Sequence, residues 1–470
     1  MFEIKPERLP IKDDLINWYY ACLELAEIID RRYPVKGTFI WLPYGFKIMK
    51  MLVEILNEIF EKNGIEEVYF PLFVPLDFAR INEEWYEGFK NEAFYVENEN
   101  AILRPTGEPA MYPIFKYWIK DGKLPIRIVQ TVSSFRKEGK TTHSLIRDRE
   151  ITFWHEIHTV HKTREEALEE MEKHKEIYNF IWKEVLCIPP IIVEKPKYEI
   201  FPGAESAFEF YSILPNGKLL ENGSINNLGQ AYAKKFDLFF VNENGEKQYV
   251  WQVCTGNGAR FLVAAFTLHG DERGLVLPPK ISPYQVIIIT IPTKENDFFD
   301  EAEKLSEEFN KENIRVFVDK SEKIPGEKFN IWDIKGVPIR IEIGEKEVKE
   351  KFYTLYRRDT KERIKVKVDE IVNKIKKILE IEMPKFLFEK VEKYYKNIIV
   401  SCNELSEVEK CIKEGKIAKA NWCGDKECFE KISQIESSVE AIGFLEEREF
   451  GKCIICNKET DRLTLIGKVY

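Results

Sequence analysis

The 470-residue sequence predicts a three-domain protein of mixed α and β structure, and three observations lead to this fold class. Strand-like segments around an Asn-Gly turn in residues 200–278 predict antiparallel sheet in an α+β domain. After residue 283 strands and helices alternate, which predicts a small α/β domain with its own sheet. The rest of the chain contains six of the nine cysteines. We therefore expect domains at 1–280, 281–382 and 383–470.

In the first domain, apolar residues at helical spacing predict one amphipathic helix over 1–30. A second helix is expected over 47–62, ending at an Asn-Gly stop signal, and a strand over 66–75. Glu and Lys at i, i+4 spacing predict a solvated covering helix over 165–185. The segments FDLFFVN and QYVWQV, on either side of NENGEK, predict a β-hairpin at 236–253.

The second domain should contain three strands and two helices. We expect strands at 285–291, 315–319 and 337–344, a helix at 297–313, a turn after the second strand and a closing helix at 368–379.

Composition places the chain among soluble globular proteins. Apolar residues make up 44% and charged residues 32%, which excludes a largely disordered chain. We expect no membrane segment, since no run of eighteen apolar residues exists. The first residues are too charged for a secretion signal, so we expect the protein in the cytoplasm, with its cysteines as thiols or metal ligands.

The net charge of −9 argues against a general nucleic-acid coat. The acidic surplus is local, because residues 51–100 contain 3 basic and 12 acidic side chains, whereas residues 101–150 contain 10 basic and 5 acidic. Binding of a nucleic acid through specific local contacts therefore stays open.

Residues 127–159 predict a β-hairpin with an unusually polar inner face. Arg136 and Arg147 could neutralise phosphates through their planar guanidinium groups. In the alternative interpretation they pair with Glu138, Glu150 and Glu156 on an exposed ribbon.

Two further segments suit a charged ligand. Arg260 starts an apolar helix after a glycine-containing loop, a position that favours a neighbouring anion. The loop at 104–108 presents Thr106 and Glu108, which suit a cationic amine, or it is an ordinary turn.

These segments together resemble the three signature motifs of class II aminoacyl-tRNA synthetases. The combination of RPTGEPAMYPIFKYWIK, SLIRDREITFWHEIHT, NLGQ, HGDERGLVLPP and PGEKFNIWDIKGVPIRIEIG resembles the prolyl-tRNA synthetases of archaeal and eukaryotic type, across essentially the whole chain. The resemblance implies a class II catalytic domain, an anticodon-binding α/β domain and a C-terminal domain. It also implies activation of proline with ATP and Mg²⁺, transfer to tRNA, and a homodimer with Pro71 at its interface.

The resemblance also implies roles for individual residues. Arg136, Arg147 and Arg260 would be catalytic and bind ATP, together with Glu138, Glu221 and Ser224. The amino acid would be bound by Thr106, Glu108, Arg136, Trp154, Glu156, His158, Asn226 and Cys254. Beside Trp154 and Glu156 on alternate strand positions, His158 fits a pocket wall better than an ordinary core histidine.

The chain departs from the family pattern at several positions that we expect near the amino-acid pocket. The departures are Gly107, Lys137, Ile157, Glu221, Asn226 and Thr255. One alternative is therefore a class II synthetase that activates a different small amino acid, and a second is a non-catalytic tRNA-binding module. The spacing between the second and third motifs leaves no room for an inserted editing domain.

Resemblance to the anticodon-binding domain implies tRNA contacts at Trp332, Lys335, Arg340, Arg357 and Arg358, although a charged run is often only a solvated face. In the last domain, Cys423, Cys428, Cys453 and Cys456 form two close pairs that suit a structural Zn²⁺ site, with unligated thiols as the alternative. The terminal Tyr470 resembles a family residue whose carboxylate lies near the active site.

Overall fold

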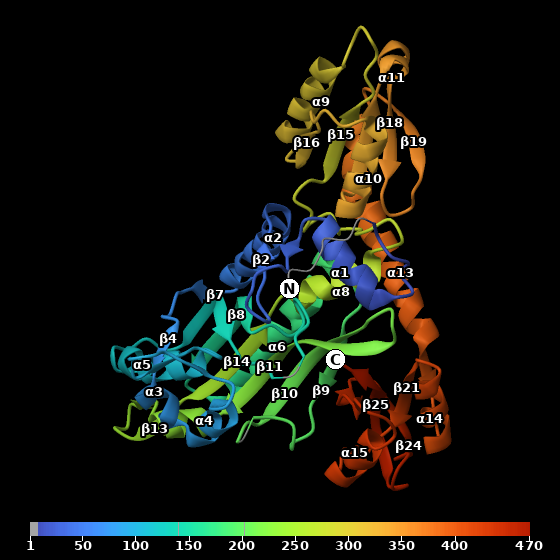
Figure 1. Cartoon of the computed structure of the whole chain (residues 1–470). Helices are drawn as coiled ribbons and strands as arrows, with labels where there is room; N and C mark the ends of the chain where they lie inside the picture. The colour runs from blue at the N-terminus through green and yellow to red at the C-terminus, as the bar shows by residue number, and fades with distance from the viewer. Residues whose placement is uncertain (1–7, 140, 202) are drawn as a thin grey trace.

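The computed structural model describes residues 8–139, 141–201 and 203–470. Figure 1 shows a large central sheet with helices packed on it, a smaller sheet domain at one end of the molecule, and the C-terminal residues beside the central sheet. The predicted fold class is confirmed. In the described part of the chain, no helix is long and apolar enough to cross a membrane.

The first helix is shorter than predicted. Helix α1 spans Leu15–Leu25, and the carboxylate of Asp14 caps it by accepting a hydrogen bond from the backbone N–H of Asn17. Residues 8–14 form turns instead, because Pro10 would break a helix that ran through it. Residues 1–7, which the prediction included, lie outside the described residues.

The second predicted helix is confirmed, and the strand after it is divided. Helix α2 spans Pro43–Lys62 and starts with a proline, which suits the first helical position. Strands β3 (Glu66–Glu67) and β4 (Phe73–Pro75) replace the single predicted strand, and Pro71, which has no N–H for a ladder, lies between them. Strand β3 pairs with the central sheet, and β4 joins a separate small sheet.

That small sheet and the helices around it precede the central hairpin. Their bounds are β5 (Phe94–Tyr95), β6 (Ala101–Leu103), α3 (Leu76–Ile81), α4 (Glu83–Phe89) and α5 (Glu108–Lys120). A two-stranded pair, β1 (Ile29–Asp30) with β2 (Ile40–Trp41), lies before α2.

The central sheet has thirteen strands, and its main path is β20-β21-β25-β11-β14-β8-β7-β3. The strands that form the site are antiparallel neighbours: β7 (Ile126–Phe135), β8 (Glu150–His161), β14 (Trp251–Asn257) and β11 (Lys218–Gly229). Beyond β11 follow β10 (Ser206–Ile213) and β9 (Ile191–Glu194). The register places His158 opposite both Ile128 and Cys254, and Cys254 opposite Asn226.

The two faces of this sheet have different surroundings. One face packs on α6 (Arg164–Phe180), on α8 (Arg260–His269) and on α2, in a core that includes Val129, Ile157 and Val253. The predicted covering helix is thus present, although it changes to a π-helical turn, η1, at Ile181–Val185. The opposite face carries the polar side chains of alternate positions.

The connection between β8 and β14 contains only elements of this domain. The predicted hairpin is confirmed in a shorter form, as β12 (Phe239–Val241) with β13 (Lys247–Tyr249), preceded by α7 (Ala231–Phe236). In the described residues of this connection no additional domain is inserted, as expected.

A separate five-stranded sheet follows, in the order β16-β15-β17-β18-β19. Its elements are β15 (Val286–Thr290), α9 (Phe299–Lys311), β16 (Val316–Val318), α10 (Pro325–Lys335), β17 (Ile339–Ile343), α11 (Glu345–Glu350), β18 (Phe352–Arg357), β19 (Arg363–Lys367) and α12 (Ile371–Lys377). The sequence reading missed α10, which stands where it placed a turn. The apolar spacing of α10 is irregular, and Lys328 and Asp333 are among its buried residues.

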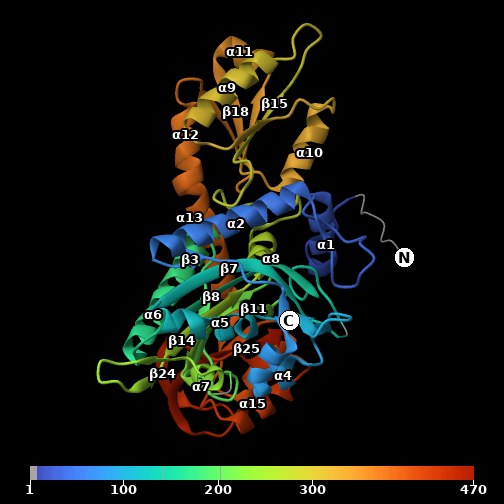
Figure 2. The same ribbon diagram turned by 90° about the vertical axis from the view of Figure 1, so that its left-hand side faces the viewer.

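The C-terminal part extends the central sheet. Its elements are η2 (Ile378–Glu382), α13 (Met383–Ile398), β20 (Ile399–Ser401), α14 (Leu405–Lys413), β21 (Ile417–Asn421), α15 (Lys426–Ser433), β22 (Val439–Ala441), β23 (Phe444–Leu445), β24 (Arg448–Lys452) and β25 (Glu459–Val469). Strand β25 pairs in parallel with β11 through Lys218 and Leu219, and β23 pairs with β9. Helix α13 runs from the domain with the five-stranded sheet, called the small sheet domain below, to this part along one side of the molecule (Figures 1 and 2).

Candidate active site

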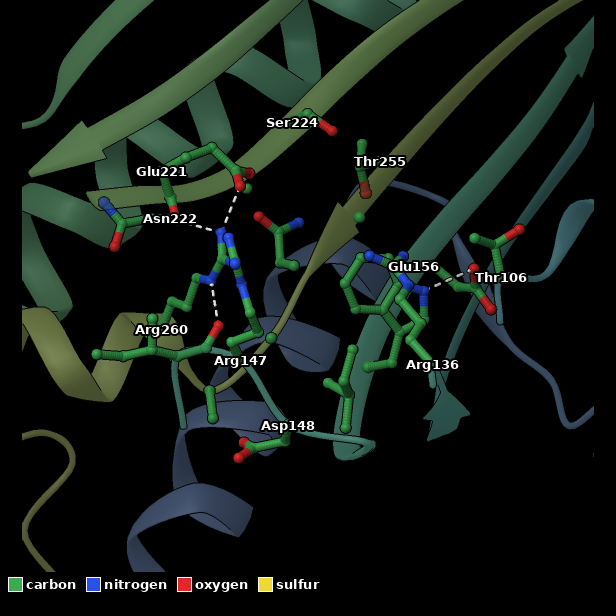
Figure 3. A pocket seen from close by; sticks show the side chains of 18 of the residues that line it. Thr106, Arg136, Arg147, Asp148, Glu156, Glu221, Asn222, Ser224, Thr255 and Arg260 are labelled. Carbon is green, nitrogen blue, oxygen red and sulfur yellow. Dashed lines mark hydrogen bonds and ion pairs between the residues drawn. The ribbon is translucent and has the colours of Figure 1, made fainter. Parts of the chain in front are cut away.

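A cavity of about 350 Å³ lies on the polar face of the central sheet. Its floor is formed by β8, β11 and β14, and the loop before α5 and the loop between β7 and β8 form its walls. Figure 3 shows Thr106, Arg136 and Glu156 toward one end, and Arg147, Glu221 and Arg260 toward the other. The cavity therefore joins two groups of functional side chains that are far apart in the sequence.

Glu156 organises one end of the cavity. Its Oε2 accepts hydrogen bonds from the backbone N–H of Gly107 and from Nε1 of Trp154, both at 2.9 Å, and its Oε1 accepts from Nε2 of Gln130 at 2.6 Å. His158 Nε2 lies 3.4 Å from Oε2. Burial acts to raise the pKa of Glu156, but His158, Arg104 and Gln130 favour its charged form, and the pKa lies below its ordinary value.

Thr106 and Glu108 lie beside this group, at the start of α5. The Thr106 hydroxyl donates to Glu108 Oε2, and the Cys254 thiol lies 4.0 Å from Glu108 Oε1. Glu108 is only 7% exposed, and no described residue forms an ion pair with it. A buried carboxylate without a cationic partner favours the binding of a cation.

Asn226 completes the wall here, and His158 lies buried next to Glu156, outside the cavity lining. The His158 ring is 1% exposed, and its Nδ1 lies 3.1 Å from the hydroxyl of Tyr112, a residue that sequence reasoning missed. Asn226 donates from Nδ2 to the Ser224 hydroxyl at 3.1 Å. Tyr112 lies four residues after Glu108 on α5, so helical spacing from Glu108 was the signal that could have found it.

Arg136 lies between the two ends without a carboxylate partner in the described residues. Its guanidinium stacks over Trp154, 5.0 Å from the ring centroid, and its Nε donates to the carbonyl of Pro105 at 3.3 Å. Burial and the charge of Arg260 lower the pKa of Arg136, yet a guanidinium stays protonated. The cation at the centre of the cavity is therefore left to attract an anion.

The other end holds Arg147 and Arg260. Arg260 donates from Nε to the carbonyl of Ile146 at 2.9 Å, and from Nη1 to the carbonyl of Glu221 at 2.8 Å and to the Glu221 carboxylate. Arg147 Nε lies 3.9 Å from Glu138 Oε2, and its side chain is 45% exposed. The pairing of Arg147 with Glu138 matches part of the alternative interpretation, but the long distance and exposure leave Arg147 able to reach a ligand.

The loop between β7 and β8, which carries Arg147, is held by contacts of Asp148 and of His143. Asp148 Oδ2 accepts from the backbone N–H of Leu145 at 2.8 Å, and burial raises the pKa of Asp148 well above its ordinary value. His143 Nδ1 lies 3.0 Å from the hydroxyl of Tyr20, and its ring packs edge-on against Tyr470, with 6.3 Å between centroids. Tyr470 thus contacts the loop that leads to Arg147, and sequence reasoning did not find Asp148 or His143.

Comparisons with known proteins identify the family. Three family models match: the tRNA synthetase class II core domain (G, H, P, S and T) at residues 89–269, an anticodon binding domain at 285–378, and the prolyl-tRNA synthetase C-terminal domain at 405–470. The proline–tRNA ligase of Methanobrevibacter smithii is 38% identical over 97% of this chain and 100% of its own. The chain belongs to the prolyl-tRNA synthetase family.

Other relatives agree. The proline–tRNA ligase of Thermoplasma volcanium is 37% identical over 98% of this chain and 99% of its own length. The prolyl-tRNA synthetase of Cryptosporidium parvum, solved with halofuginone and AMPPNP, superposes with a TM-score of 0.92 at 29% identity, over 98% of this chain and 99% of that one. A second structure of that enzyme, with L-proline and AMP, gives a TM-score of 0.90 with the same coverage.

Two of the departures from the family pattern, Ile157 and Lys137, are not among the residues that line the cavity, and a third, Thr255, is a lining residue whose hydroxyl bonds to the other side of the sheet. Ile157 is fully buried in the core beneath the sheet, and the Thr255 hydroxyl lies 3.0 Å from the Tyr178 hydroxyl of α6, on that same side. Lys137 is exposed, and its backbone N–H donates to the carbonyl of Glu92. The expectation that these residues lie at the pocket therefore fails for Ile157, which strand alternation points away, and for Lys137, but Thr255 does lie in the cavity lining.

The departures at Gly107 and Asn226 do line or adjoin the cavity. A Cβ at position 107 would lie 2.6 Å from Glu156 Oε1, so the absence of a side chain lets Glu156 approach the backbone. Glu221 also lies in the cavity wall, where it holds Arg260. The altered positions that line or adjoin the cavity are thus Gly107, Glu221, Asn226 and Thr255.

The arginines that we expected to contact the anticodon are engaged within the protein. Arg340 pairs with Asp333 at 2.7 Å and Glu342 at 3.1 Å, and only 5% of its side chain is exposed. Arg357 pairs with two acids, Asp359 (2.8 Å) and Glu382 (2.7 Å). Arg358 is 1% exposed and pairs with Asp271. All three guanidinium groups are paired within the protein, and their assignment to the anticodon stays a prediction.

The two remaining anticodon candidates also have partners. Trp332 is buried and donates from Nε1 to Asp319 Oδ2 at 2.8 Å. Lys335 Nζ pairs with Glu27 Oε2 at 2.5 Å and so joins the small sheet domain to the segment after α1. The partner of Lys335 comes from a distant part of the chain, so the local sequence did not reveal it.

The four cysteines of the C-terminal part come together as predicted. The sulfur atoms of Cys423, Cys428, Cys453 and Cys456 all lie within 4.8 Å of one another. Cys423 Sγ lies 3.6 Å from Cys428 Sγ and 3.8 Å from Cys456 Sγ. A tetrahedral Zn²⁺ with Zn–S bonds of about 2.3 Å requires S–S separations of about 3.8 Å, so these residues fit the ion. Cys402 and Cys411 are buried outside this cluster.

Proposed function

We propose that this chain is a proline–tRNA ligase that makes prolyl-adenylate from proline and ATP and transfers proline to the 3′ end of tRNA. The observation that carries the proposal is a pair of unmatched charges in one cavity. Glu108 is a buried anion and Arg136 a cation, and neither has an ion-pair partner among the described residues. A free amino acid is a zwitterion, so its ammonium group would pair with Glu108 and its carboxylate with Arg136.

The amino-acid end would recognise the secondary ammonium of proline. This group has two N–H donors, and the Thr106 hydroxyl and the Glu108 carboxylate offer two acceptors side by side. Trp154, His158, Asn226 and Cys254 would surround the ring, with Glu156 fixing Trp154 and the backbone of Gly107. Relatives named proline–tRNA ligase support proline as the substrate.

ATP would occupy the other end. Arg136 would bind the α-phosphate, Arg147 and Arg260 the outer phosphates, and Glu138 the adenine amino group, with Glu221 and Ser224 in the adjoining wall. Mg²⁺ would enter with the phosphates and share their negative charge, and Glu138 and Glu221 are carboxylates of the cavity lining that could help to hold it.

The reaction would need positioning and charge stabilisation from the protein. A carboxylate oxygen of proline attacks the α-phosphorus of ATP. The bond between the α-phosphorus and the oxygen that bridges it to the β-phosphorus breaks, and pyrophosphate leaves. Arg136 lies where negative charge develops. In the second step a ribose hydroxyl of tRNA attacks the carbonyl carbon, and AMP leaves.

ATP–pyrophosphate exchange with a panel of amino acids tests this function. We expect exchange that depends on proline and that falls by at least tenfold in Glu108→Gln, with Glu99→Gln, in the loop between β5 and β6, as the matched control. Exchange that depends on another small amino acid would support the alternative substrate, for which the changes at Gly107 and Asn226 are the specific observation. A panel without any exchange, with tRNA binding retained, would support a non-catalytic module.

We also propose a homodimer in the cytoplasm and a structural Zn²⁺ at the four cysteines. An apolar groove formed by residues 68–71, 73, 75, 78, 110, 114 and 118 leaves Tyr69 72% and Phe73 57% exposed, and a second copy of the chain would cover it. Pro71 lies in this groove. Sedimentation of the wild type and of Phe73→Asp tests the dimer, which a monomeric wild type would contradict.

A further inference from the structure

Helix α8 connects the ATP end of the cavity to the small sheet domain. Its first residue, Arg260, holds Glu221 and the carbonyl of Ile146, and Asp271 follows two residues after its last residue, His269. A ten-residue helix is about 15 Å long and moves as one body. Both views place α8 between the two sheets (Figures 1 and 2).

Asp271 is bound by a residue of the anticodon-binding domain. Arg358 Nη1 donates to Asp271 Oδ2 at 2.8 Å, and Nη2 donates to Oδ1 at 2.6 Å. The Nε of Arg358 donates to the carbonyl of Asp333 at 2.9 Å, so all three nitrogen atoms of the guanidinium have partners. A bidentate pair fixes orientation as well as distance, which a single contact cannot do.

Other donors bind the same end of α8. Lys390 Nζ donates to the carbonyl of His269 at 2.7 Å, Lys12 Nζ donates to the carbonyl of Gly270, and Trp18 Nε1 donates to the carbonyl of Asp271 at 3.0 Å. Lys361 Nζ lies 3.2 Å from Asp271 Oδ2. Cations at the C-terminal end of a helix also interact favourably with its dipole. Of the contacts to the Asp271 carboxylate, those from Arg358 and Lys361 come from the anticodon-binding domain.

We propose that Arg358 and Asp271 form a positioning pair that holds α8, and with it the guanidinium of Arg260, in the place that ATP binding requires. The anticodon-binding domain thereby contributes a positioning residue to the ATP site of the catalytic domain. This inference rests on the proposed function, because that function assigns Arg260 to ATP.

Thermodynamic linkage makes the coupling between the ATP site and the Arg358–Asp271 pair act in both directions. If the position of Arg358 sets the affinity for ATP, then ATP in the cavity also sets the position of Arg358 and of the domain that carries it. The pair therefore couples the nucleotide site to the surface on which tRNA is recognised, without any contact between the two ligands.

The test measures ATP–pyrophosphate exchange without tRNA. The double variant Asp271→Asn with Arg358→Gln removes both charges together, which avoids leaving one buried charge unpaired. We expect the KM for ATP to rise roughly tenfold and the KM for proline to stay unchanged, since misplacement of a binding group by a fraction of an ångström weakens only its own contacts. Arg358→Lys, which keeps the charge but loses the bidentate contact, should give a smaller rise.

Two controls separate positioning from general docking of the domain. Glu27→Gln removes a different inter-domain ion pair, with Lys335, which does not touch α8, and it should leave the KM for ATP unchanged. In an Arg260→Lys background, the double variant should add little further effect, because both changes act through the same contact. Thermal melts of each variant confirm that it is folded.

An unchanged KM for ATP in the folded double variant would overturn the inference. An equal rise in Glu27→Gln would also overturn it, because the effect would then come from domain docking in general. If the double variant does not fold, Arg358→Lys decides by the same comparison. Failure of the proposed function has a different signature, since the wild-type protein itself would then show no exchange with proline.

Discussion

The indole Nε1 of Trp154 donates to the carboxylate of Glu156, 2.9 Å away, on the same strand of the central sheet. The two residues occupy alternate positions of β8, so both side chains lie on the cavity face. Arg136 stacks on the ring of Trp154. The carboxylate thus fixes an aromatic surface, and that surface supports the cation at the centre of the site.

Glu156→Gln should weaken the binding of proline. The amide places an NH₂ group against one of the donors that now bind the carboxylate, the Gly107 or Trp154 N–H or the Gln130 amide, and an unsatisfied buried donor costs about 1–3 kcal/mol. We expect the KM for proline to rise about tenfold or more, with a smaller change in the KM for ATP. Glu150→Gln, on the same strand, is the control. Equal values in variant and wild type would contradict the role of Glu156.

Thr255→Ala should lower stability and leave the KM for proline unchanged. Thr255 lies in the cavity lining, but its hydroxyl bonds to Tyr178 beneath the sheet, so loss of the hydroxyl costs about 1 kcal/mol of unfolding free energy. Urea unfolding and pyrophosphate exchange on the same preparation check both parts. A changed preference among amino acids would show that residue 255 acts on the pocket after all.

Removal of Zn²⁺ should destabilise the C-terminal part. We expect about one Zn²⁺ per chain in the purified protein, its loss in Cys428→Ser, and a lower melting temperature, since structural zinc contributes directly to folding. Metal analysis and thermal melts provide the measurement. Cys402→Ala, outside the cluster, should retain the metal, and a metal-free wild type of equal stability would refute the site.

Stability should fall as the pH decreases from about 6.5 toward 4. Burial lowers the pKa of His155 and of His161 to about 4, and that of His269 to about 3. An unfolded histidine titrates near pH 6.5, so between these values the unfolded state binds more protons and stability rises with pH. Each unit of pKa difference corresponds to about 1.4 kcal/mol.

The measurement is the urea unfolding free energy at pH 7.5, 6 and 5. Glu170 and Asp271, with pKa values of about 2, change the free energy mainly below pH 5, whereas burial raises the pKa of Asp148 and of Glu209, so these two carboxyls oppose the histidines within the window. In the same pH window, imidazole NMR signals of His155, His161 and His269 that titrate near pH 6.5 in the folded protein would show that these histidines are not buried in their neutral form.

Tyr470→Ala should raise the KM for ATP a few-fold. The Tyr470 ring packs against His143, in the loop that leads to Arg147, and Lys218 Nζ lies 4.8 Å from its centroid. Loss of the ring removes one support of that loop. Phe450→Ala, at a side chain that is 92% exposed, is the matched control. If both variants have wild-type kinetics, Tyr470 does not support the ATP end of the cavity.

The sequence was informative where local patterns decide the structure. Alternation on β8 placed Trp154, Glu156 and His158 on one face, and the spacing of Cys423, Cys428, Cys453 and Cys456 predicted their cluster. The same alternation places the side chain of Ile157 in the core beneath the sheet, and it turns the Thr255 hydroxyl toward Tyr178.

The partners of charged groups were not predicted, and this holds for near partners, such as Asp333 and Glu342 for Arg340, as well as for distant ones. Arg358 pairs with Asp271, 87 residues earlier in the chain, and Lys335 pairs with Glu27, 308 residues earlier. A local sequence pattern cannot predict either pair. Helix α10 was missed because its contacts with β15, rather than a regular apolar stripe, hold it in place. Local reading therefore identified the residue types of the site better than the partners of the charged groups.

Strand β25 has a consequence for synthesis of the protein on the ribosome. Because β25 lies between β21 and β11, the end of β11 at Lys218 and Leu219 keeps an unpaired edge until residues 459–469 have emerged. Domains generally fold in the order of their synthesis, and open strand edges are prone to pair with other chains. The nascent catalytic domain must therefore pass through a stage in which its sheet is open to mispairing, and chaperones that shield strand edges would act at that stage.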